Sequence, residues 1–372
     1  MTSIKQREDG KWRARYRDAG GREHARHFSR KVDARRWLDE VTAAIVTGQY
    51  VDPSAGRVTF RVYAEQWREA QVHRPSSQAH VESLLRRHAY PTLGERPLSS
   101  LLPSEIQAWV KRLSVDGPGR KALAPSTIGV LHSIVSSVFK AAVRDRRLVA
   151  NPCEGTRLPK APKTRVVPPT TEQVDVVRSG MPKRLKALVS FSAGTGMRPA
   201  EVRGLTIDRL DVQEREVLVD RQLVAVRGGR AVFGPPKTEA SQRRIPLPQS
   251  VVDVLVLHLE SYPPGVDGLV FTLDEGTPIS RQAMGHLWRP LAKAAGLPER
   301  SGPHSLRHYY ASLLIRFGES VTTVQARLGH ATAAETLDTY SHLWPDSDDR
   351  TRDAIDSVLG APADRLRTRD PR

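Results

Sequence analysis

The 372-residue sequence has very little cysteine, and its absences exclude several protein classes. The one cysteine, Cys153, allows no intrachain disulfide bond and no cysteine-based zinc site. No apolar run approaches the roughly 18 residues that cross a bilayer. The N-terminus, MTSIKQREDGKWRAR, lacks the apolar core of a secretory signal. We therefore expect no membrane contact and a location in the cytoplasm.

Lysine is also scarce, because 12 of the 58 cationic side chains are Lys and 46 are Arg. The net charge is +17, and the isoelectric point is about 10.4. The planar fork of arginine fits phosphate, so the surplus indicates a polyanionic partner, most simply a nucleic acid. A GC-rich coding sequence would explain Arg in place of Lys but not the net charge. At roughly 150 residues per domain, the length predicts two or three globular domains.

The first segment, residues 1–56, predicts a small sheet-and-helix domain. Residues 11–17, KWRARYR, alternate between apolar and basic side chains, which is strand periodicity with one basic face: Arg13, Arg15 and Arg17. A turn and a second strand ending at Phe28 follow. Ser29 is the predicted cap of a helix that ends at Gly48. The basic face fits a DNA groove, and it equally fits an ordinary solvated strand.

Residues 57–155 read as a bundle of four short helices. We expect them to begin at Thr59, near residue 77, after Ser104 and after Ser126, with a loop over YPTLGERPL. A proline-rich linker follows over residues 156–169, and its cations, Arg157, Lys160 and Lys163, suit a phosphate backbone. A plain solubilising linker is the alternative.

Residues 170–345 show a mixed pattern. Helices are predicted near 171–179, 183–193, 199–204, 248–260, 280–295, 305–317, 320–328 and 333–339. Short strands are predicted near 206–212, 216–224, 230–233 and 244–247. Residues 346–372 read as an extended tail. The fold class is therefore α+β and multidomain, with a mainly helical third domain that carries a small antiparallel sheet.

Four clusters in this third domain carry the candidate chemistry. In TGMRPAEVRGL, Gly194 and Gly196 allow a sharp turn before Arg198, and Glu201 shares its helical face. In PPKTEASQRRIPL, Lys237 is predicted at a turn between two strands, within reach of a groove. Each feature alone also fits an ordinary surface ion pair or an exposed lysine.

The other two clusters contain histidine. In PHSLRHYYAS, three side chains share one helical face: His304, Arg307 and His308. Residue 305 is Ser rather than the Glu of a zinc protease, and no carboxylate cluster for magnesium is nearby, so no metal or other cofactor is expected. In RLGHATAAETLDTYSHLWP, His330 precedes Tyr340 by ten residues. A half-buried packing aromatic is the alternative for Tyr340.

Taken together, the four clusters describe one reaction. Attack of a tyrosine on a phosphodiester develops negative charge on two non-bridging oxygens, and two arginine forks can neutralise that charge without a metal. The leaving sugar oxygen needs a proton, which a lysine can give. The phenol has a reference pKa of about 10 and must lose its proton, which neighbouring cations and a histidine assist.

These clusters resemble the tyrosine recombinases of the phage integrase family. TGMRPAEVRGL resembles the family's first arginine box, HSLRH its second, and LGHATAAETLDTYSHL its segment with the final histidine and the nucleophile. The resemblance runs from about residue 57 to 345, and residues 1–56 resemble the arm-site-binding domain of longer integrases. It implies Tyr340 as the nucleophile, activated by Arg198, Lys237, His304, Arg307 and His330.

The resemblance implies a site-specific recombinase that integrates or excises a phage or mobile element through a 3′-phosphotyrosyl intermediate. Its domains would be an arm-site domain (1–56), a core-binding bundle (57–155) and a catalytic domain (170–345). It further implies a homotetramer on synapsed attachment sites of double-stranded DNA, in the cytoplasm of a bacterial host. The need for an accessory directionality factor stays open. The rivals are a type IB topoisomerase, a catalytically dead DNA-binding regulator and a metal-dependent nuclease.

Overall fold

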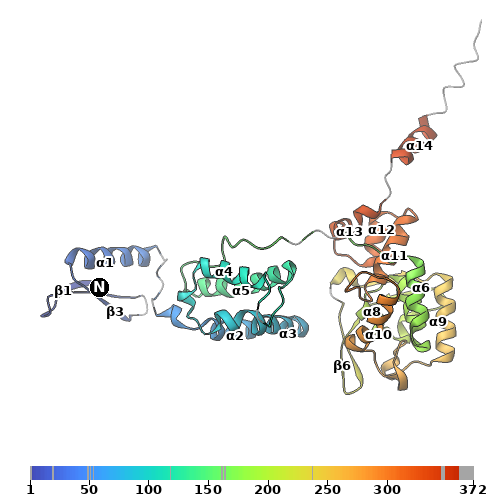
Figure 1. Cartoon of the computed structure of the whole chain (residues 1–372), viewed down its shortest axis with the longest axis horizontal. Helices are drawn as coiled ribbons and strands as arrows, with labels where there is room; N and C mark the ends of the chain where they lie inside the picture. Colours follow the sequence, from blue (N-terminus) through green and yellow to red (C-terminus); the bar gives the residue numbers. More distant parts are fainter. Residues whose placement is uncertain are drawn as a thin grey trace, which may run out of the picture. The chain divides into compact units, whose positions relative to one another are not determined.

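The structure is a computed structural model that describes residues 2–18, 21–47, 50, 52, 54–117, 119–160, 162, 165–236, 238–344 and 348–359. The chain divides into two compact units, residues 1–163 and 164–372. Within the described ranges, the first unit holds one three-stranded sheet, and the second holds a three-stranded and a two-stranded sheet (Figure 1).

The N-terminal sheet pairs its strands antiparallel in chain order. Its elements are β1 (Ser3–Gln6), β2 (Trp12–Arg17), β3 (Glu23–Phe28) and the covering helix α1 (Lys31–Val46). The predicted alternation is confirmed, because Ala14 and Tyr16 are buried while Arg13 and Arg17 are exposed. Strand β1 was not predicted. The helix cap at Ser29 is wrong, since Arg30 is the last extended residue, and the predicted stop at Gly48 lies outside the described residues.

Among the described residues of 57–155, four α-helices surround one apolar core, as predicted. They are α2 (Phe60–Glu69), α3 (Pro75–Leu84), α4 (Pro103–Leu113) and α5 (Pro125–Arg144). The hydroxyl of Thr59 accepts a hydrogen bond from the third residue on and caps α2. The caps predicted at Ser104 and Ser126 are wrong, because each helix begins at the preceding proline. Proline is favoured at a first helical position, where an N–H would have no partner.

The loop predicted over YPTLGERPL is largely wrong. A π-helix, η2 (Leu85–Gly94), continues from α3 and contains Pro91. Tyr90 and Leu93 are buried in the bundle core, so burial of these side chains outweighs the helix-breaking proline. Helix α5 is apolar and long enough to cross a membrane by length and composition alone. Six of its side chains lie in the bundle core, which accounts for that composition.

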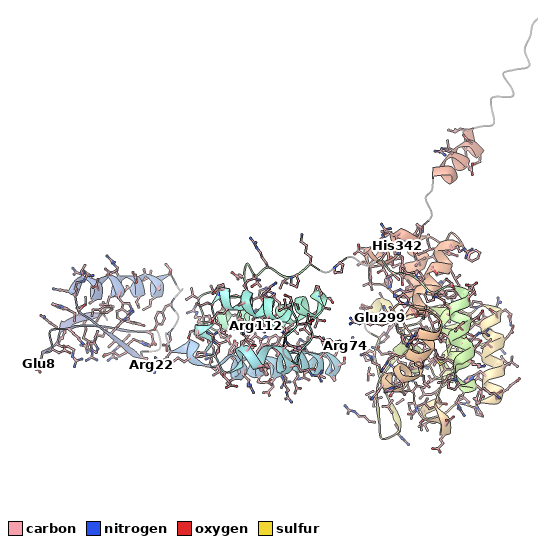
Figure 2. All side chains as sticks on the ribbon, in the orientation of Figure 1. Glu8, Arg22, Arg74, Arg112, Glu299 and His342 are labelled. Atoms are coloured by element: carbon pink, nitrogen blue, oxygen red, sulfur yellow. The ribbon has the colours of Figure 1, made fainter. Side chains whose placement is uncertain are left out.

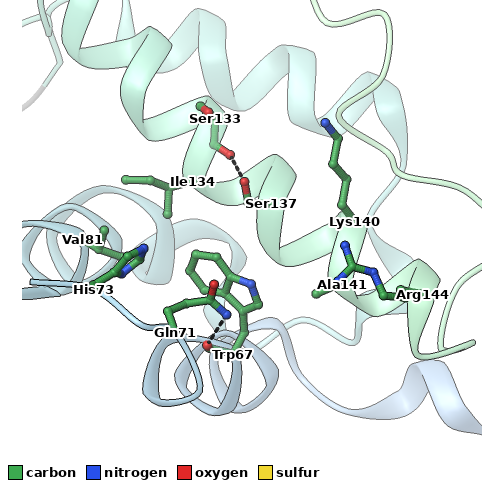
Figure 3. Close-up of a pocket in the computed structure, with 10 residues that line it drawn as sticks. All are labelled: Trp67, Gln71, His73, Val81, Ser133, Ile134, Ser137, Lys140, Ala141 and Arg144. Atoms are coloured by element: carbon green, nitrogen blue, oxygen red, sulfur yellow. Dashed lines mark hydrogen bonds between the residues drawn. The ribbon is translucent and has the colours of Figure 1, made fainter. Parts of the chain in front are cut away.

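A groove of about 410 Å³ opens on the bundle beside α2, α3 and α5 (Figure 3). Trp67 and Val81 line it together with the polar edge of α5, and Lys140 and Arg144 give it a basic side. The hydroxyl of Ser137 donates a hydrogen bond to the carbonyl of Ser133 within the same helix. The groove therefore combines an apolar floor with two cations.

The second unit places most of its helices around a large core. They are α6 (Thr171–Gly180), α7 (Lys186–Thr195), α8 (Pro199–Arg203), α9 (Gln249–Ser261), α10 (Arg281–Ala294), α11 (Ser305–Arg316), α12 (Val321–Leu328) and α13 (Ala333–Tyr340). Phe191, Trp288 and Leu306 lie in that core, and a smaller cluster joins α11 and α12 to Tyr340. His342, labelled in Figure 2, donates to the carbonyl of Val166 at 2.8 Å and ties the end of this region to its beginning.

The strands of the second unit form two sheets rather than the one predicted. They are β4 (Leu210–Asp211), β5 (Glu216–Val219), β6 (Gln222–Arg227), β7 (Arg230–Gly234) and β8 (Arg243–Pro246), in the orders β4-β5-β8 and β6-β7. The strand predicted over 216–224 is divided at residues 220–221. The extended tail is wrong over α14 (Asp348–Leu359), where Ile355, Val358 and Leu359 follow helical spacing. Residues 360–372 lie outside the described residues.

Candidate active site

A sharp turn between α7 and α8 positions Arg198. Helix α7 ends at Gly196, whose φ is 62°, and a Cβ added there would lie 2.3 Å from the ring of Tyr310. Only glycine fits both the left-handed backbone and this approach. Arg198 then caps the N-terminus of α8. The predicted turn is confirmed at Gly196, whereas Gly194 lies inside α7, where an added Cβ would meet Val251 at 2.4 Å.

Three acceptors hold the guanidinium of Arg198. Its Nη1 donates to Glu201 Oε1 at 3.0 Å and to Ser241 Oγ at 2.9 Å, and its Nη2 donates to the carbonyl of Gly329 at 2.9 Å. The backbone N–H of Arg198 also donates to Glu201, so the predicted pairing of these residues is confirmed. The side chain of Arg198 remains 19% exposed and reaches the pocket described below.

Arg307 is held by carbonyls alone among the side-chain hydrogen bonds that the structure describes for it. Its Nη1 donates to the carbonyl of Gly196 at 2.9 Å, and its Nη2 donates to the carbonyl of Leu328 at 2.6 Å. Both acceptors lie at helix C-termini, where carbonyls lack intrahelical partners and carry partial negative charge. Burial, together with the nearby cations Arg198 and Arg243, lowers the pKa of Arg307 to about 9. The site thus holds a buried cation without a matching carboxylate of its own.

A pocket of about 320 Å³ brings together four of the six predicted catalytic residues. It is lined by Arg198, Thr238, His304, Arg307, His330 and Glu335. His304 immediately precedes α11 and is exposed. His330 is buried, and its Nδ1 is 2.8 Å from Thr336 Oγ1. Two guanidiniums and two imidazoles therefore face one cavity.

Positive charge accumulates in this pocket. Burial of the ring and the neighbouring cations lower the pKa of His304 to about 4, and burial and Arg307 lower that of His330 in the same direction. Each cation makes it harder for the next group to be protonated. A phosphate in the pocket would supply the missing negative charge and reverse these shifts.

Tyr340 lies at the end of α13, beside the pocket but covered. Its side chain is 1% exposed, and its ring stacks on His330 at a centroid distance of 6.4 Å. Its hydroxyl is 2.8 Å from Nδ1 of His308, whose pKa burial and Arg307 lower to about 4. Burial raises the pKa of Tyr340 to about 12. In this conformation the phenol is protonated and hydrogen-bonded to a neutral imidazole.

Lys237 lies outside the described residues, so its position is not described. The strands on either side of it, β7 and β8, pair in different sheets. The segment that contains Lys237 therefore lies between two strands, as predicted, but these strands form no hairpin with each other. The described residues 235–236 and 238–242 run from one sheet to the other. The neighbouring Thr238 lines the pocket, and its hydroxyl is 2.8 Å from that of Ser241.

The predicted DNA-binding residues lie away from this pocket in the chain. Arg13, Arg15 and Arg17 share one face of the N-terminal sheet around a single carboxylate, Glu23, at 3.4–3.9 Å. Arg157 and Lys160 are exposed after the bundle, where Gln107 fixes the backbone of Arg157 by two hydrogen bonds. Lys163 lies outside the described residues.

Sequence reasoning missed three residues of the site. His308 was placed on the correct helical face but given no partner, while Ser241 and Arg243 were not considered. The sequence signal for the last two was their position within the segment PPKTEASQRRIPL, which also contains Lys237. Among the described residues, one group could ligate a metal ion, namely Asp18, His24 and Asp52 in the N-terminal unit. Its His24 Nε2 and Asp18 Oδ2 are already hydrogen-bonded to each other at 2.8 Å.

Family models match three successive segments of the chain, and all three are phage integrase domains. Residues 171–346 match the phage integrase family, residues 60–158 the phage integrase central domain and residues 2–47 the phage integrase N-terminal domain. The putative prophage phiRv2 integrase of Mycobacterium tuberculosis is 27% identical over 350 residues, which cover 91% of this chain and 90% of that protein.

Two solved structures share the fold. The integrase of transposon Tn1549, in complex with a circular intermediate DNA, has a TM-score of 0.68 and 23% identity, covering 81% of this chain and 99% of that one. The lambda integrase tetramer bound to a Holliday junction has a TM-score of 0.59 and 17% identity, covering 89% and 96%.

Proposed function

The chain belongs to the phage integrase family of tyrosine recombinases, and from that premise we propose that its pocket cuts and rejoins DNA with Tyr340 as the nucleophile. The observation that carries this proposal is the fixed pair of guanidiniums, Arg198 and Arg307, around a cavity beside Tyr340. Such a cavity suits a phosphodiester whose two non-bridging oxygens gain charge during attack.

The proposed reaction has two balanced steps. The Oη of Tyr340 attacks phosphorus, the bond from phosphorus to the 5′ oxygen breaks, and a 3′-phosphotyrosyl bond forms. The phenol proton passes to a neighbouring base, for which His304 and His330 are the candidates, and Lys237 protonates the leaving oxygen. In the second step the 5′-hydroxyl of the partner strand attacks the phosphotyrosine and gives its proton to Lys237. The bond from phosphorus to the Tyr340 oxygen breaks, and the protonated base returns a proton to the phenolate. Bond energy is conserved in the covalent intermediate, so we propose that neither ATP nor a metal ion takes part.

Substrate contacts beyond the pocket follow from the charge distribution. We propose that residues 57–155 and 170–345 bind one attachment site, with the linker cations Arg157, Lys160 and Lys163 along its backbone. Residues 1–56 would form an arm-site domain whose face carries Arg13, Arg15 and Arg17. The sharing of one Glu23 among these three arginines leaves a surplus of positive charge, which supports this role.

The proposed assembly is a homotetramer on two synapsed sites, in the cytoplasm of a bacterial host. The fold shared with the lambda integrase tetramer on a Holliday junction supports this assembly. An accessory directionality factor would act on the same complex.

The test is covalent trapping on a nicked substrate, which loses a short fragment after cleavage. The wild-type protein should form an adduct that survives denaturation, and Tyr340→Phe should form none while still binding the site. Tyr309→Phe is a matched control, because its hydroxyl contacts Thr171 Oγ1 at 3.1 Å and is not part of the pocket lining. An adduct that persists in Tyr340→Phe contradicts the assignment.

Two further arms separate the rivals. Cleavage should continue in EDTA, and its loss there would favour a metal-dependent nuclease. Strand exchange between two defined sites, rather than relaxation of supercoils alone, distinguishes a recombinase from a type IB topoisomerase.

A further inference from the structure

A second buried arginine shares the carboxylate that holds Arg198. Arg243, in β8, donates from Nη2 to Glu201 Oε2 at 3.0 Å, while Arg198 donates to the other oxygen, Oε1. The side chains of Arg243 and Glu201 are 6% and 1% exposed, so water screens this contact very little. One carboxylate thus lies between two guanidiniums.

The remaining donors of Arg243 fix its position. Its Nε donates to the carbonyl of Arg327 at 2.8 Å, and its Nη1 donates to the carbonyl of Ser241 at 2.8 Å. It also packs against Gly329, where an added Cβ would lie 3.1 Å from its Nη1. The segments that it joins are those that supply Ser241 and Gly329, the two other acceptors of Arg198.

The charges explain why a second arginine is needed. A buried carboxylate paired with Arg198 alone would cancel its charge, leaving a well-oriented fork with little attraction for phosphate. Arg243 contributes the compensating positive charge on the far side of Glu201. Although burial alone would raise it, Arg243 and Arg198 together hold the pKa of Glu201 below its usual range, so the carboxylate stays ionised.

We propose that Arg243 is a positioning residue that neutralises Glu201 and thereby leaves the charge of Arg198 available to the scissile phosphate. Arg243 does not line the pocket and acts through Glu201 and Arg198. This inference rests on the proposed strand cleavage.

The experiment compares two substrates with Arg243→Gln. One carries the ordinary phosphate at the cleavage position, and the other carries a methylphosphonate, in which a neutral methyl group replaces one charged oxygen. We expect adduct formation on the phosphate to slow by at least about tenfold. Without Arg243, the charge of Glu201 cancels that of Arg198, which then stabilises the negative charge of the transition state less. On the methylphosphonate the loss should shrink to about threefold or less.

A matched control is available on the same strand. Arg244→Gln removes the next arginine, which is 61% exposed and pairs with Glu216 at 3.3 Å. Arg244→Gln should slow adduct formation on neither substrate. Arg243→Lys keeps the charge and should recover part of the lost rate on the phosphate.

Loss of a buried charge can also unfold the domain, so a second variant is needed. Glu201→Gln combined with Arg243→Gln removes both buried charges and leaves Arg198 uncancelled. It should cleave the phosphate faster than Arg243→Gln. Urea unfolding of each variant shows which ones are folded.

The outcomes separate the two proposals. Equal losses of rate on both substrates would show that Arg243 only supports the fold. An unchanged rate of Arg243→Gln on the phosphate would also overturn the inference. So would a double variant that cleaves the phosphate no faster than Arg243→Gln. If the wild-type protein forms no adduct at all, the proposed function fails instead.

Discussion

The arginines of the N-terminal sheet and those of the pocket beside Tyr340 are the same residue type in opposite settings. Arg13, Arg15 and Arg17 are 45%, 39% and 62% exposed, with Glu23 as their shared carboxylate. Arg307 is 2% exposed, and carbonyls at 2.6 and 2.9 Å fix its fork. One set is screened by water, and the other is not.

The difference determines what each set can do. An exposed cation attracts a phosphate over a distance, contributes modestly, and loses that contribution as salt rises. A buried and oriented cation needs no rearrangement when charge develops in a transition state. The first set is suited to affinity and the second to chemistry. The same change, Arg to a neutral residue, should therefore affect different measurements in the two regions.

Substitution of Arg307 should have the largest effect. Arg307→Ala should slow adduct formation by at least roughly 10²-fold, the scale for removing one fixed donor to a developing oxyanion. Arg307→Lys should remain slow, because an ammonium cannot span the carbonyls of Gly196 and Leu328 and still face the pocket. Single-turnover kinetics at saturating DNA make the measurement. Full activity of the Lys variant would show that charge alone suffices and that orientation does not matter.

Substitution of the exposed arginines should have a smaller effect, on binding only. The triple change of Arg13, Arg15 and Arg17 to Gln should weaken binding to a full attachment site and reduce the salt slope by up to about 2.7. Adduct formation on an isolated core site should be unchanged. Binding is measured by titration across a salt series. An unchanged slope would mean that this face is an ordinary solvated strand.

Lowering the pH should produce the smallest effect, a loss of folding stability through the histidines beside the pocket. The pKa of His308 is about 4 in the folded chain, against about 6.5 when unfolded. Between these values the unfolded chain binds more protons, so stability falls as pH drops from about 6.5 towards 4. His308→Gln should remove about 2 kcal/mol of this drop between pH 7.5 and 5.0. Urea unfolding at pH 7.5 and 5.0 checks it, and an identical drop in the variant would contradict it.

The sequence predicted the elements that rest on periodicity and the residues that rest on short spacings. The basic strand face at Arg13, the helix capped by Thr59 and the pairing of Arg198 with Glu201 are all local, and all three are confirmed. The caps at Ser104 and Ser126 were wrong because the proline directly before each serine is an equally local and competing signal.

Contacts between distant segments could not be predicted. Arg243 and Glu201 are 42 residues apart, and nothing in either segment alone specifies that they meet. Likewise, the helical face of His308 was evident, but its hydrogen bond to Tyr340 depends on how α13 packs against α11. The π-helix around Pro91 formed against local preference because the bundle core buries its side chains. The roles of the pocket residues remain predictions.

With Tyr340 as the proposed nucleophile, its covered position makes strand cleavage conditional on how long the DNA stays bound. While its hydroxyl rests on His308, a passing strand finds the pocket without a nucleophile in it. A genome offers on the order of 10⁶–10⁹ wrong sites for each right one, and visits to wrong sites are brief. A visit must outlast the wait for the phenol to be uncovered before any bond can break. Residence at a site thus becomes a second criterion of selection, independent of how its bases are read, and it makes accidental breaks in host DNA rare.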